Sequence, residues 1–222
     1  MIQTQALHFH YATSPEMFFA DLRVPQGGTL LLHGNSGSGK STWLALAAGM
    51  LTPAGGEVTV AGERLSRLSR TRLDHWRART VGFLPQKLHL SDALTVEGNL
   101  ALAYFAAGLP EDAGTIARSL RTLGVGDLAD RKPTQLSGGQ AQRVALARTI
   151  LMQPKVILAD EPTASLDDDA ARDGLELLRS CAQQCNATLV IATHDRRVQD
   201  TFPDALVYKI GIQPEWARRA RT

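Results

Sequence analysis

One short segment near the N-terminus constrains the fold of this chain more than any other. Residues 34–41 read Gly-Asn-Ser-Gly-Ser-Gly-Lys-Ser and fit the pattern G-x-x-x-x-G-K-[ST]. The apolar residues 29–33 before it predict a strand, and the alanine- and leucine-rich residues 41–50 after it predict a helix. Strand, glycine-rich loop and helix in this order form a loop whose backbone N–H groups point at phosphate oxygens. The segment therefore predicts a nucleotide-binding α/β fold.

The residue types in this loop suit phosphate chemistry. The N-terminus of the following helix adds partial positive charge, and Lys40 can reach the β- and γ-phosphates of a nucleotide. This makes Lys40 a candidate catalytic residue as well, while the hydroxyl of Ser41 can ligate Mg²⁺. The candidate nucleotide-binding residues of the segment are Gly34, Asn35, Ser36, Gly37, Ser38, Gly39, Lys40, Ser41 and Thr42.

Two acidic residues follow an apolar strand in the second half of the chain. Residues 156–159 read Val-Ile-Leu-Ala, and Asp160 and Glu161 come directly after them. The carboxyl end of a strand in an open parallel sheet is where ligands sit. Two acids after a strand are, on their own, most often part of a solvated turn, but the phosphate loop favours a functional role. We expect Asp160 to take part in Mg²⁺ coordination and Glu161 to orient and polarise the attacking water.

The order of the predicted elements gives an α/β core interrupted by a helical insertion. The first quarter contains short strand-like segments, at residues 6–10, 18–24 and 57–61. Residues 92–153 have the helical spacing of apolar side chains. Two continuous apolar runs, 156–159 and 188–192, predict parallel strands covered on both faces, and residues 168–184 between them predict a helix.

The composition excludes several classes of protein. The formal net charge is +2 and aromatic residues make up 5%, so neither bulk charge nor stacking surface favours nucleic-acid binding. No run approaches the ~20 apolar residues of a membrane span, and the N-terminus lacks the basic and apolar regions of a signal peptide. We expect a cytoplasmic chain in which Cys181 and Cys185 are reduced thiols.

Residues 136–140 read Leu-Ser-Gly-Gly-Gln and carry a family resemblance. With the phosphate loop and the Asp160-Glu161 pair, this LSGGQ segment resembles the signature of the ATP-binding cassette ATPases, over about residues 5–210. The resemblance implies a P-loop NTPase (RecA-like) α/β core, an N-terminal antiparallel β-subdomain and an inserted α-helical subdomain. It implies one domain, with a core of residues 1–86 and 154–210, a helical insertion of about 87–153 and a C-terminal tail of 211–222.

The resemblance also assigns roles to single residues. Tyr11 resembles the aromatic residue that stacks on adenine, and Gln86 resembles the glutamine that links the Mg²⁺ site to the helical insertion. His194 resembles the switch histidine that contacts the γ-phosphate, and residues 165–167 resemble a loop that crosses to a partner subunit. The implied catalytic residues are Glu161, His194, Gln86 and Lys40. The implied ligands of Mg²⁺ are Ser41, Gln86 and Asp160.

The LSGGQ segment implies a dimer. Its serine begins a helix, and its two glycines expose backbone N–H groups at the positive end of that helix. In this family such a second cradle, here Ser137, Gly138, Gly139 and Gln140, serves the nucleotide of another subunit, so that two chains enclose two ATP molecules. We expect a homodimer in the ATP state, an integral membrane permease as partner, no nucleic acid, and a position on the inner face of the cell membrane.

Two alternatives to a transport ATPase are a soluble cassette ATPase acting on DNA or ribosomes and a regulatory cassette that does not hydrolyse ATP. The soluble forms usually carry two cassettes or long insertions, which this sequence lacks, and Gln86, Glu161 and His194 are all present. Residues 62–65 and 81–83 resemble the macrolide-export, lipoprotein-release and cell-division branch. Residues 164–167 depart from that branch, because they read Ala-Ser-Leu-Asp in place of Gly-Asn-Leu-Asp.

Two surface features stay open from the sequence. The six arginines between residues 64 and 79 form either a solvated face or a basic patch that faces acidic groups of a partner or lipid headgroups. Three further arginines lie in the tail: Arg218, Arg219 and Arg221. The resemblance implies that loop 87–91, followed by Leu94, Leu100 and Tyr104, forms the apolar floor of a groove for a permease helix. Alternatively, the leucines of this loop belong to the core of the insertion.

Overall fold

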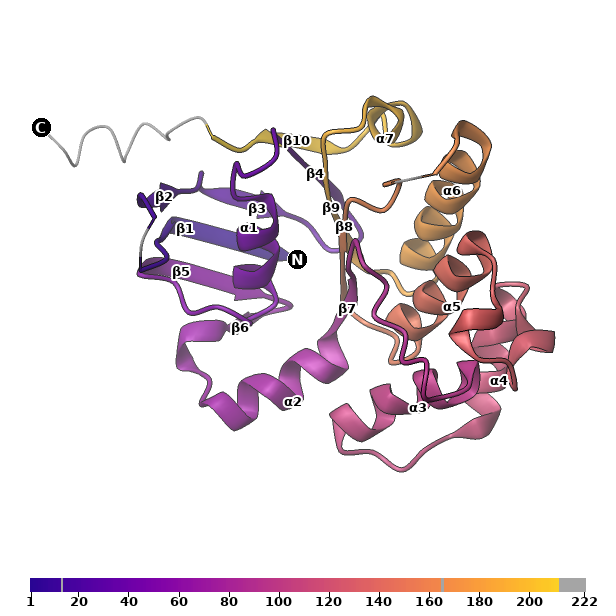
Figure 1. Ribbon diagram of the computed structural model, residues 1–222. Coiled ribbons are helices and arrows are strands. Elements are labelled where there is room, and N and C mark those ends of the chain that lie inside the picture. The colour runs from indigo at the N-terminus through magenta and orange to yellow at the C-terminus, as the bar shows by residue number, and fades with distance from the viewer. Residues whose placement is uncertain (13, 165, 212–222) are drawn as a thin grey trace, which may run out of the picture.

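The computed structural model describes residues 1–12, 14–164 and 166–211, which form two sheets and the helices around them (Figure 1). The smaller sheet is antiparallel, with strand order β2-β1-β5-β6 and β3 paired to β1. Its strands are β1 (Ile2–Phe9), β2 (Met17–Phe18), β3 (Leu22–Val24), β5 (Gly55–Val60) and β6 (Glu63–Arg64). The predicted N-terminal antiparallel sheet is therefore confirmed.

The larger sheet is parallel throughout and has the strand order β10-β4-β9-β8-β7. Its strands are β4 (Thr29–His33), β7 (Val81–Leu84), β8 (Val156–Asp160), β9 (Thr188–Thr193) and β10 (Leu206–Lys209). The three central strands are buried along most of their length because side chains cover both faces. This confirms the parallel strands that the continuous apolar runs predict.

Helices fill the space on both sides of the parallel sheet and continue into the insertion. The helices are α1 (Lys40–Ala47), α2 (Arg70–Thr80), α3 (Val96–Ala107), α4 (Ala113–Thr122), α5 (Gly138–Ile150), α6 (Asp168–Gln184) and α7 (Arg196–Thr201), with short 3-10 turns η1 (Leu65–Arg67), η2 (Gly126–Leu128) and η3 (Pro133–Gln135). Five of the α-helices begin at a side chain that accepts a backbone N–H: Thr95, Asp112, Ser137, Asp167 and Asp195. Helix α6 has the predicted bounds.

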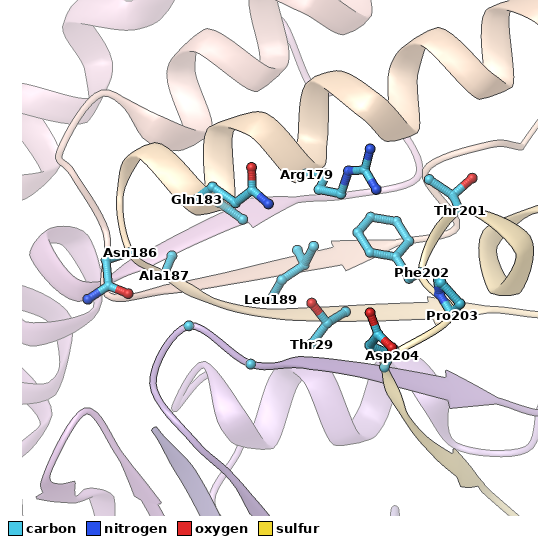
Figure 2. Close-up of a pocket in the computed structure, with 14 residues that line it drawn as sticks. Thr29, Arg179, Gln183, Asn186, Ala187, Leu189, Thr201, Phe202, Pro203 and Asp204 are labelled. Atoms are coloured by element: carbon cyan, nitrogen blue, oxygen red, sulfur yellow. The ribbon is translucent and has the colours of Figure 1, made fainter.

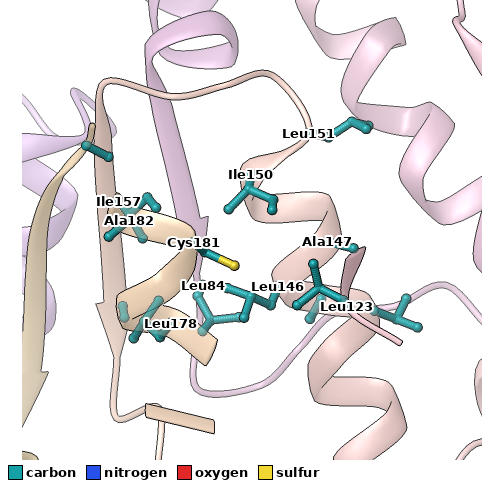
Figure 3. Close-up of a cluster of buried hydrophobic side chains, with 14 of the residues drawn as sticks. Leu84, Leu123, Leu146, Ala147, Ile150, Leu151, Ile157, Leu178, Cys181 and Ala182 are labelled. Carbon is teal, nitrogen blue, oxygen red and sulfur yellow. The ribbon is translucent and has the colours of Figure 1, made fainter. Parts of the chain in front are cut away.

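The parallel sheet separates two hydrophobic cores because neighbouring residues of a strand point to opposite faces. On β4, Leu30 and Leu32 pack with α1 and the antiparallel sheet, whereas Leu31 packs with α3–α6. All three leucines are at most 1% exposed, and burying each contributes about 1.5–3 kcal/mol. Figure 3 shows the second core, where side chains of α5 and α6 meet those of β7 and β8.

One predicted strand, residues 18–24, is wrong. It is split into β2 and β3, which pair with opposite ends of β1. A register shift lies between Gln5 and His8 in the pairing of β1 with β5, and Ala6 there has a φ of 45°. The backbone N–H of Ala6 instead donates to the Asp21 side chain at 2.6 Å, which holds the break between β2 and β3.

The two cysteines are free thiols. Cys181 lies in the core shown in Figure 3, where burial, with a further contribution from the neighbouring Cys185, raises its pKa to about 12. Burial raises the pKa of Cys185 as well. Both side chains therefore stay protonated at neutral pH and are poor nucleophiles.

No helix among the described residues combines the length and the apolar character that crossing a bilayer requires.

Candidate functional site

A cleft of about 620 Å³ opens at the carboxyl ends of the parallel strands. The residues before and after the ends of β4, β8 and β9 carry the polar groups that line it. Of the predicted site residues it brings together Tyr11, Ser36, Gly37, Gly39, Lys40, Ser41, Thr42, Gln86, Asp160, Glu161 and His194. Gly34, Asn35 and Ser38 complete the loop without lining the cleft. Residues separated by up to 183 positions thus meet at one edge of the sheet, where α/β folds bind ligands.

The loop from residue 34 to 41 depends on its glycines for its shape. Gly39, which precedes α1, has a φ of 102°, a backbone conformation that side chains with a Cβ rarely adopt. A Cβ at Gly34 would come within 2.5 Å of the Ser38 hydroxyl. Lys40 is 6% exposed, and its Nζ donates to the carbonyl oxygens of Gly34 at 2.8 Å and Asn35 at 3.2 Å. The loop therefore curls around the Lys40 ammonium group, which is the shape of a loop that surrounds a phosphate.

Three charged or ionisable groups meet at Glu161. Its Oε1 lies 3.3 Å from Lys40 Nζ and 2.9 Å from His194 Nδ1. The Glu161 side chain is 12% exposed and that of His194 is 70% exposed. Glu161 has a φ of 46°, which is uncommon for a residue other than glycine and is found at functional sites. A nucleotide phosphate that attracted Lys40 would leave the Glu161 carboxylate free to accept a proton from water.

Asp160 is suited to a cation. Its Oδ1 is buried and has no hydrogen-bond partner among the described residues. Burial raises the pKa of Asp160 above its usual range, against the opposing effect of the Ser41 hydroxyl, while Glu161 raises it further and Lys40 lowers it. An unpartnered buried carboxylate oxygen of this kind is stabilised by a bound positive charge.

A magnesium ion fits this donor set only together with phosphate oxygens. Among the described residues, no group of three or more His, Cys, Asp or Glu side chains could hold a metal ion by itself. Ser41, Gln86 and Asp160 line the same cleft and offer hydroxyl, amide and carboxylate oxygens. Mg²⁺ is usually bound by one or two carboxylates completed by substrate phosphates, so the residues present fit a nucleotide-bound Mg²⁺.

Tyr11 stands at the open side of the cleft. Its ring is 45% exposed and contacts Phe9 edge-on, with ring centroids 4.8 Å apart. Its hydroxyl lies 3.2 Å from Thr42 Oγ1, which fixes the tyrosine relative to the first turn of α1. One face of an exposed, held aromatic ring at this place can stack on a nucleotide base.

The LSGGQ segment lies outside this cleft, and none of Ser137, Gly138, Gly139 and Gln140 lines it. Ser137 caps α5, and its backbone N–H donates to Gln140 Oε1 at 2.9 Å while its hydroxyl accepts from the Gln140 N–H. A Cβ at Gly138 or Gly139 would meet nothing within 4 Å, so the N-terminal end of α5 is open. Such an end can bind an anion from another molecule. Residue 165 of the predicted crossing loop lies outside the described residues.

Asp195 is a further residue of the site region that the sequence motifs do not single out. Its carboxylate accepts the Thr163 hydroxyl at 2.7 Å and pairs with Arg197, which also reaches Asp168 at 2.8 Å. These contacts join the turn after Glu161 to the loop that carries His194. The Thr-His-Asp order of residues 193–195 before a short helix is a signal for an N-cap at Asp195, which the structure has.

We expect Asp195→Asn to destabilise the protein in a pH-dependent way. Hydrogen bonds from Arg197 and, to a smaller extent, from Thr163 lower the pKa of Asp195 from 3.8 to about 2, although burial acts in the opposite direction. Its stabilisation is present above pH 3.8 and is lost as the pH falls towards 2. The variant should lower the free energy of unfolding by roughly 1–2 kcal/mol at neutral pH, and the difference should shrink at about pH 3. Urea unfolding at both pH values measures it, with exposed Asp130→Asn as control; a pH-independent difference would contradict the ion-pair explanation.

A second cavity, of about 470 Å³, lies at the opposite end of the sheet (Figure 2). It opens between α6, which contributes Arg179 and Gln183, and the turn that carries Phe202 and Asp204. Thr29 and Leu189 mark the amino ends of β4 and β9 in its wall. None of the residues predicted for phosphate chemistry lines this cavity, so it is separate from the cleft.

The exposed apolar residues of the insertion differ from those expected. Leu100 and Tyr104 are 0% and 8% exposed and belong to the core, so they cannot form the floor of a groove. The leucines of loop 87–91 are partly buried against that same core. The exposed side chains are Leu102, at 44%, Phe105, at 86%, and Leu109, at 39%. Sequence alone does not distinguish the buried face of α3 from its exposed face, because both faces are apolar.

Comparisons with known proteins agree on one family. A family model described as ABC transporter matches residues 19–164. The lipoprotein-releasing system ATP-binding protein LolD of Anaeromyxobacter dehalogenans is 42% identical over 190 residues, which cover 84% of this chain and 80% of the relative. The macrolide export ATP-binding/permease protein MacB 1 of Aeromonas hydrophila is 39% identical over 204 residues, which cover 91% of this chain and 31% of that relative.

Solved structures have the same fold. The ATP-binding cassette MJ0796, in a dimeric post-hydrolysis state bound to ADP and Pi, superposes with a TM-score of 0.83 at 28% identity and 95% coverage of both chains. The cbiO1 protein of Clostridium perfringens, part of the ABC transporter complex cbiONQ, gives a TM-score of 0.83 at 27% identity, covering 95% of this chain and 85% of that one.

Proposed function

This chain belongs to the ABC transporter family, and from that premise we propose that it is the ATP-hydrolysing subunit of a membrane transport complex of the lipoprotein-releasing or macrolide-exporting kind. The observation that carries the proposal is the cleft that joins the phosphate loop to Gln86, Glu161 and His194. The relatives are named as part of a lipoprotein-releasing system and as a macrolide export ATP-binding/permease protein, which disfavours a soluble ATPase acting on DNA or ribosomes. Phosphate release from ATP by the purified chain is the direct test, and its absence would contradict the proposal.

The reaction is the attack of water on the γ-phosphorus of ATP, which breaks the bond to the β-phosphate oxygen and yields ADP and phosphate. Glu161 orients the water and accepts its proton, since its carboxylate ends the buried strand β8. Lys40 and the N–H groups of the loop neutralise the phosphate charge. His194 shares a hydrogen bond with Glu161 and is exposed enough to contact the γ-phosphate as well.

Ser41, Asp160 and Gln86 are the residues that would hold Mg²⁺. When bound, the ion neutralises charge on the β- and γ-phosphates. Gln86 precedes a loop tied to the insertion, because Arg148 of α5 donates to the carbonyl oxygens of Leu88 and His89. Movement of the insertion would therefore move Gln86 relative to the cleft. Tyr11 holds the adenine by stacking, which is worth ~1–3 kcal/mol per base.

The active assembly is a homodimer that encloses two ATP molecules. The open N-terminal end of α5, with Ser137, Gly138, Gly139 and Gln140, binds the phosphates held by the second subunit. Each chain supplies one phosphate loop and one LSGGQ segment, so the interface is isologous. The dimeric form of the neighbour MJ0796 supports this arrangement.

The second partner is an integral membrane permease, which places the chain peripherally on the inner face of the cell membrane. The exposed residues Leu102, Phe105 and Leu109 follow one another at helical spacing on α3 and just beyond it, and we assign them to the contact with a cytoplasmic permease helix. The same insertion carries the α5 arginine that holds the Gln86 loop, so the contact would be coupled to the cleft.

Phe105→Asp is expected to leave the isolated chain folded and active and to abolish copurification with the permease. The side chain is 86% exposed, so its removal takes almost no packing from the core. Loss of a central aromatic contact typically weakens an interface by roughly 2 kcal/mol or more, about thirtyfold. Leu206→Asp, on the exposed edge strand β10, is the matched control and should copurify normally. Equal retention of the permease by both variants would assign Phe105 to another role.

A further inference from the structure

The positive charge of this chain is concentrated in one segment. Residues 62–80 contain six arginines and two acidic residues, a net charge of +4, whereas the whole chain has a net charge of +2. The remainder of the chain is therefore net negative. The segment comprises β6, the turn η1 and the helix α2, and α2 has no fully buried residue.

The six arginines divide into two groups. Arg77 donates to the Gly49 carbonyl oxygen and pairs with Asp74, and Arg79 donates to the Ala107 carbonyl oxygen. These two anchor α2 to the end of α1 and to α3. The other four are exposed and form no ion pair with any described residue: Arg64, Arg67, Arg70 and Arg72. We call these four the basic face.

The helix that carries Arg70 and Arg72 of the basic face packs against the insertion through its C-terminal half. Helices α2 and α3 are neighbours at the same end of the molecule (Figure 1). Arg79 of α2 donates to the carbonyl oxygen of Ala107 in α3, and the His75 ring of α2 lies next to Gly108, the C-cap of α3. Phe105 is on that end of α3 and is the most exposed large apolar residue described. Exposed arginines at an end of the molecule that also exposes aromatic and aliphatic side chains have the composition of surfaces that bind membrane interfaces.

We propose that the basic face binds the anionic headgroups of the membrane surface, in addition to the contact with the permease. Guanidinium groups form bidentate hydrogen bonds with phosphate oxygens, and none of these four is engaged by an acidic residue of the described chain. Each arginine near an anionic surface contributes ~1 kcal/mol, roughly a fivefold factor in partitioning. The proposed membrane partnership supplies the setting, but lipid binding by the isolated chain requires neither the permease nor hydrolysis.

The test is sedimentation of the purified full chain with vesicles that contain phosphatidylglycerol or only phosphatidylcholine. We expect binding to the anionic vesicles alone, weakened by added salt. The variant R64Q/R67Q/R70Q/R72Q should lose at least roughly tenfold in affinity. The control R118Q/R121Q/R131Q/R172Q removes the same charge from four exposed positions elsewhere and should bind like the wild type. A chain ending at residue 211 separates any contribution of the tail arginines.

ATPase activity and the unfolding midpoint of each variant are measured alongside and should be unchanged, because the basic face touches neither the cleft nor a core. An equal loss of vesicle affinity in both quadruple variants would overturn the proposal, since it would show that only the net charge of the chain matters and not the position of the arginines. Loss in the shortened chain alone would assign lipid binding to the tail. No binding of the wild type to anionic vesicles, with loss of permease copurification in the basic-face variant, would assign the patch to acidic groups of the permease.

Discussion

Lys40→Ala is expected to reduce ATP hydrolysis by at least roughly 10²–10³-fold and to weaken ATP binding. The ammonium group is buried beside the phosphate loop, within 3.3 Å of the Glu161 carboxylate, so no other cation of the described chain can take its place there. Without it, negative charge developing on the phosphates has no partner at this position. Phosphate release at saturating ATP measures the first effect, and equilibrium binding of a fluorescent ATP analogue measures the second.

Two further variants separate charge from folding. Lys40→Met keeps the length of the apolar stem and should be as inactive as Lys40→Ala, because only the ammonium group acts on phosphate. Lys155→Ala removes a lysine from an exposed position before β8 and should hydrolyse ATP normally. Wild-type activity in Lys40→Met would refute the role of the charge, whatever the stability of the two variants.

The parts of the fold that the sequence predicts are those with a local physical cause. The predicted strands at 29–33, 156–159 and 188–192 are mostly apolar because the parallel strands they belong to are covered on both faces. Helix α6 has the predicted bounds, and in the structure its buried residues recur at helical spacing after an N-cap at Asp167. The phosphate loop is predicted because a fixed spacing of glycines and lysine is contained in eight residues.

The parts that it does not predict depend on distant contacts. Helix α2 has only two apolar residues at helical spacing, Leu73 and Trp76, which are partly buried against the core. Arg77 and Arg79 add hydrogen bonds to carbonyl oxygens that lie 28 residues away along the chain. The meeting of Lys40, Glu161 and His194 follows from strand order, since β9 lies between β4 and β8. Strand order cannot be deduced from periodicity or motif spacing. Only the family resemblance could predict that these three residues lie together.

Replacing Glu161 with glutamine is expected to slow hydrolysis by roughly 10²–10⁴-fold and to trap an ATP-bound dimer. The amide keeps the shape of the side chain and its hydrogen bond to His194, so the cleft stays intact, but it cannot accept a proton from water. ATP then remains between two subunits, bound by the phosphate loop of one and the LSGGQ segment of the other. Light scattering should give twice the mass of the chain with ATP and the mass of one chain without it.

A second substitution decides whether the trapped dimer uses the open end of α5. Gly139→Asp adds a side chain where nothing lies within 4 Å of the new Cβ, and an acidic residue suits the first turn of a helix, so folding should be retained. The added carboxylate would repel a phosphate presented by the other subunit. Glu161→Gln with Gly139→Asp should therefore bind ATP through its own phosphate loop and stay monomeric. A double variant that still dimerises with ATP would show that the LSGGQ segment does not form the dimer interface.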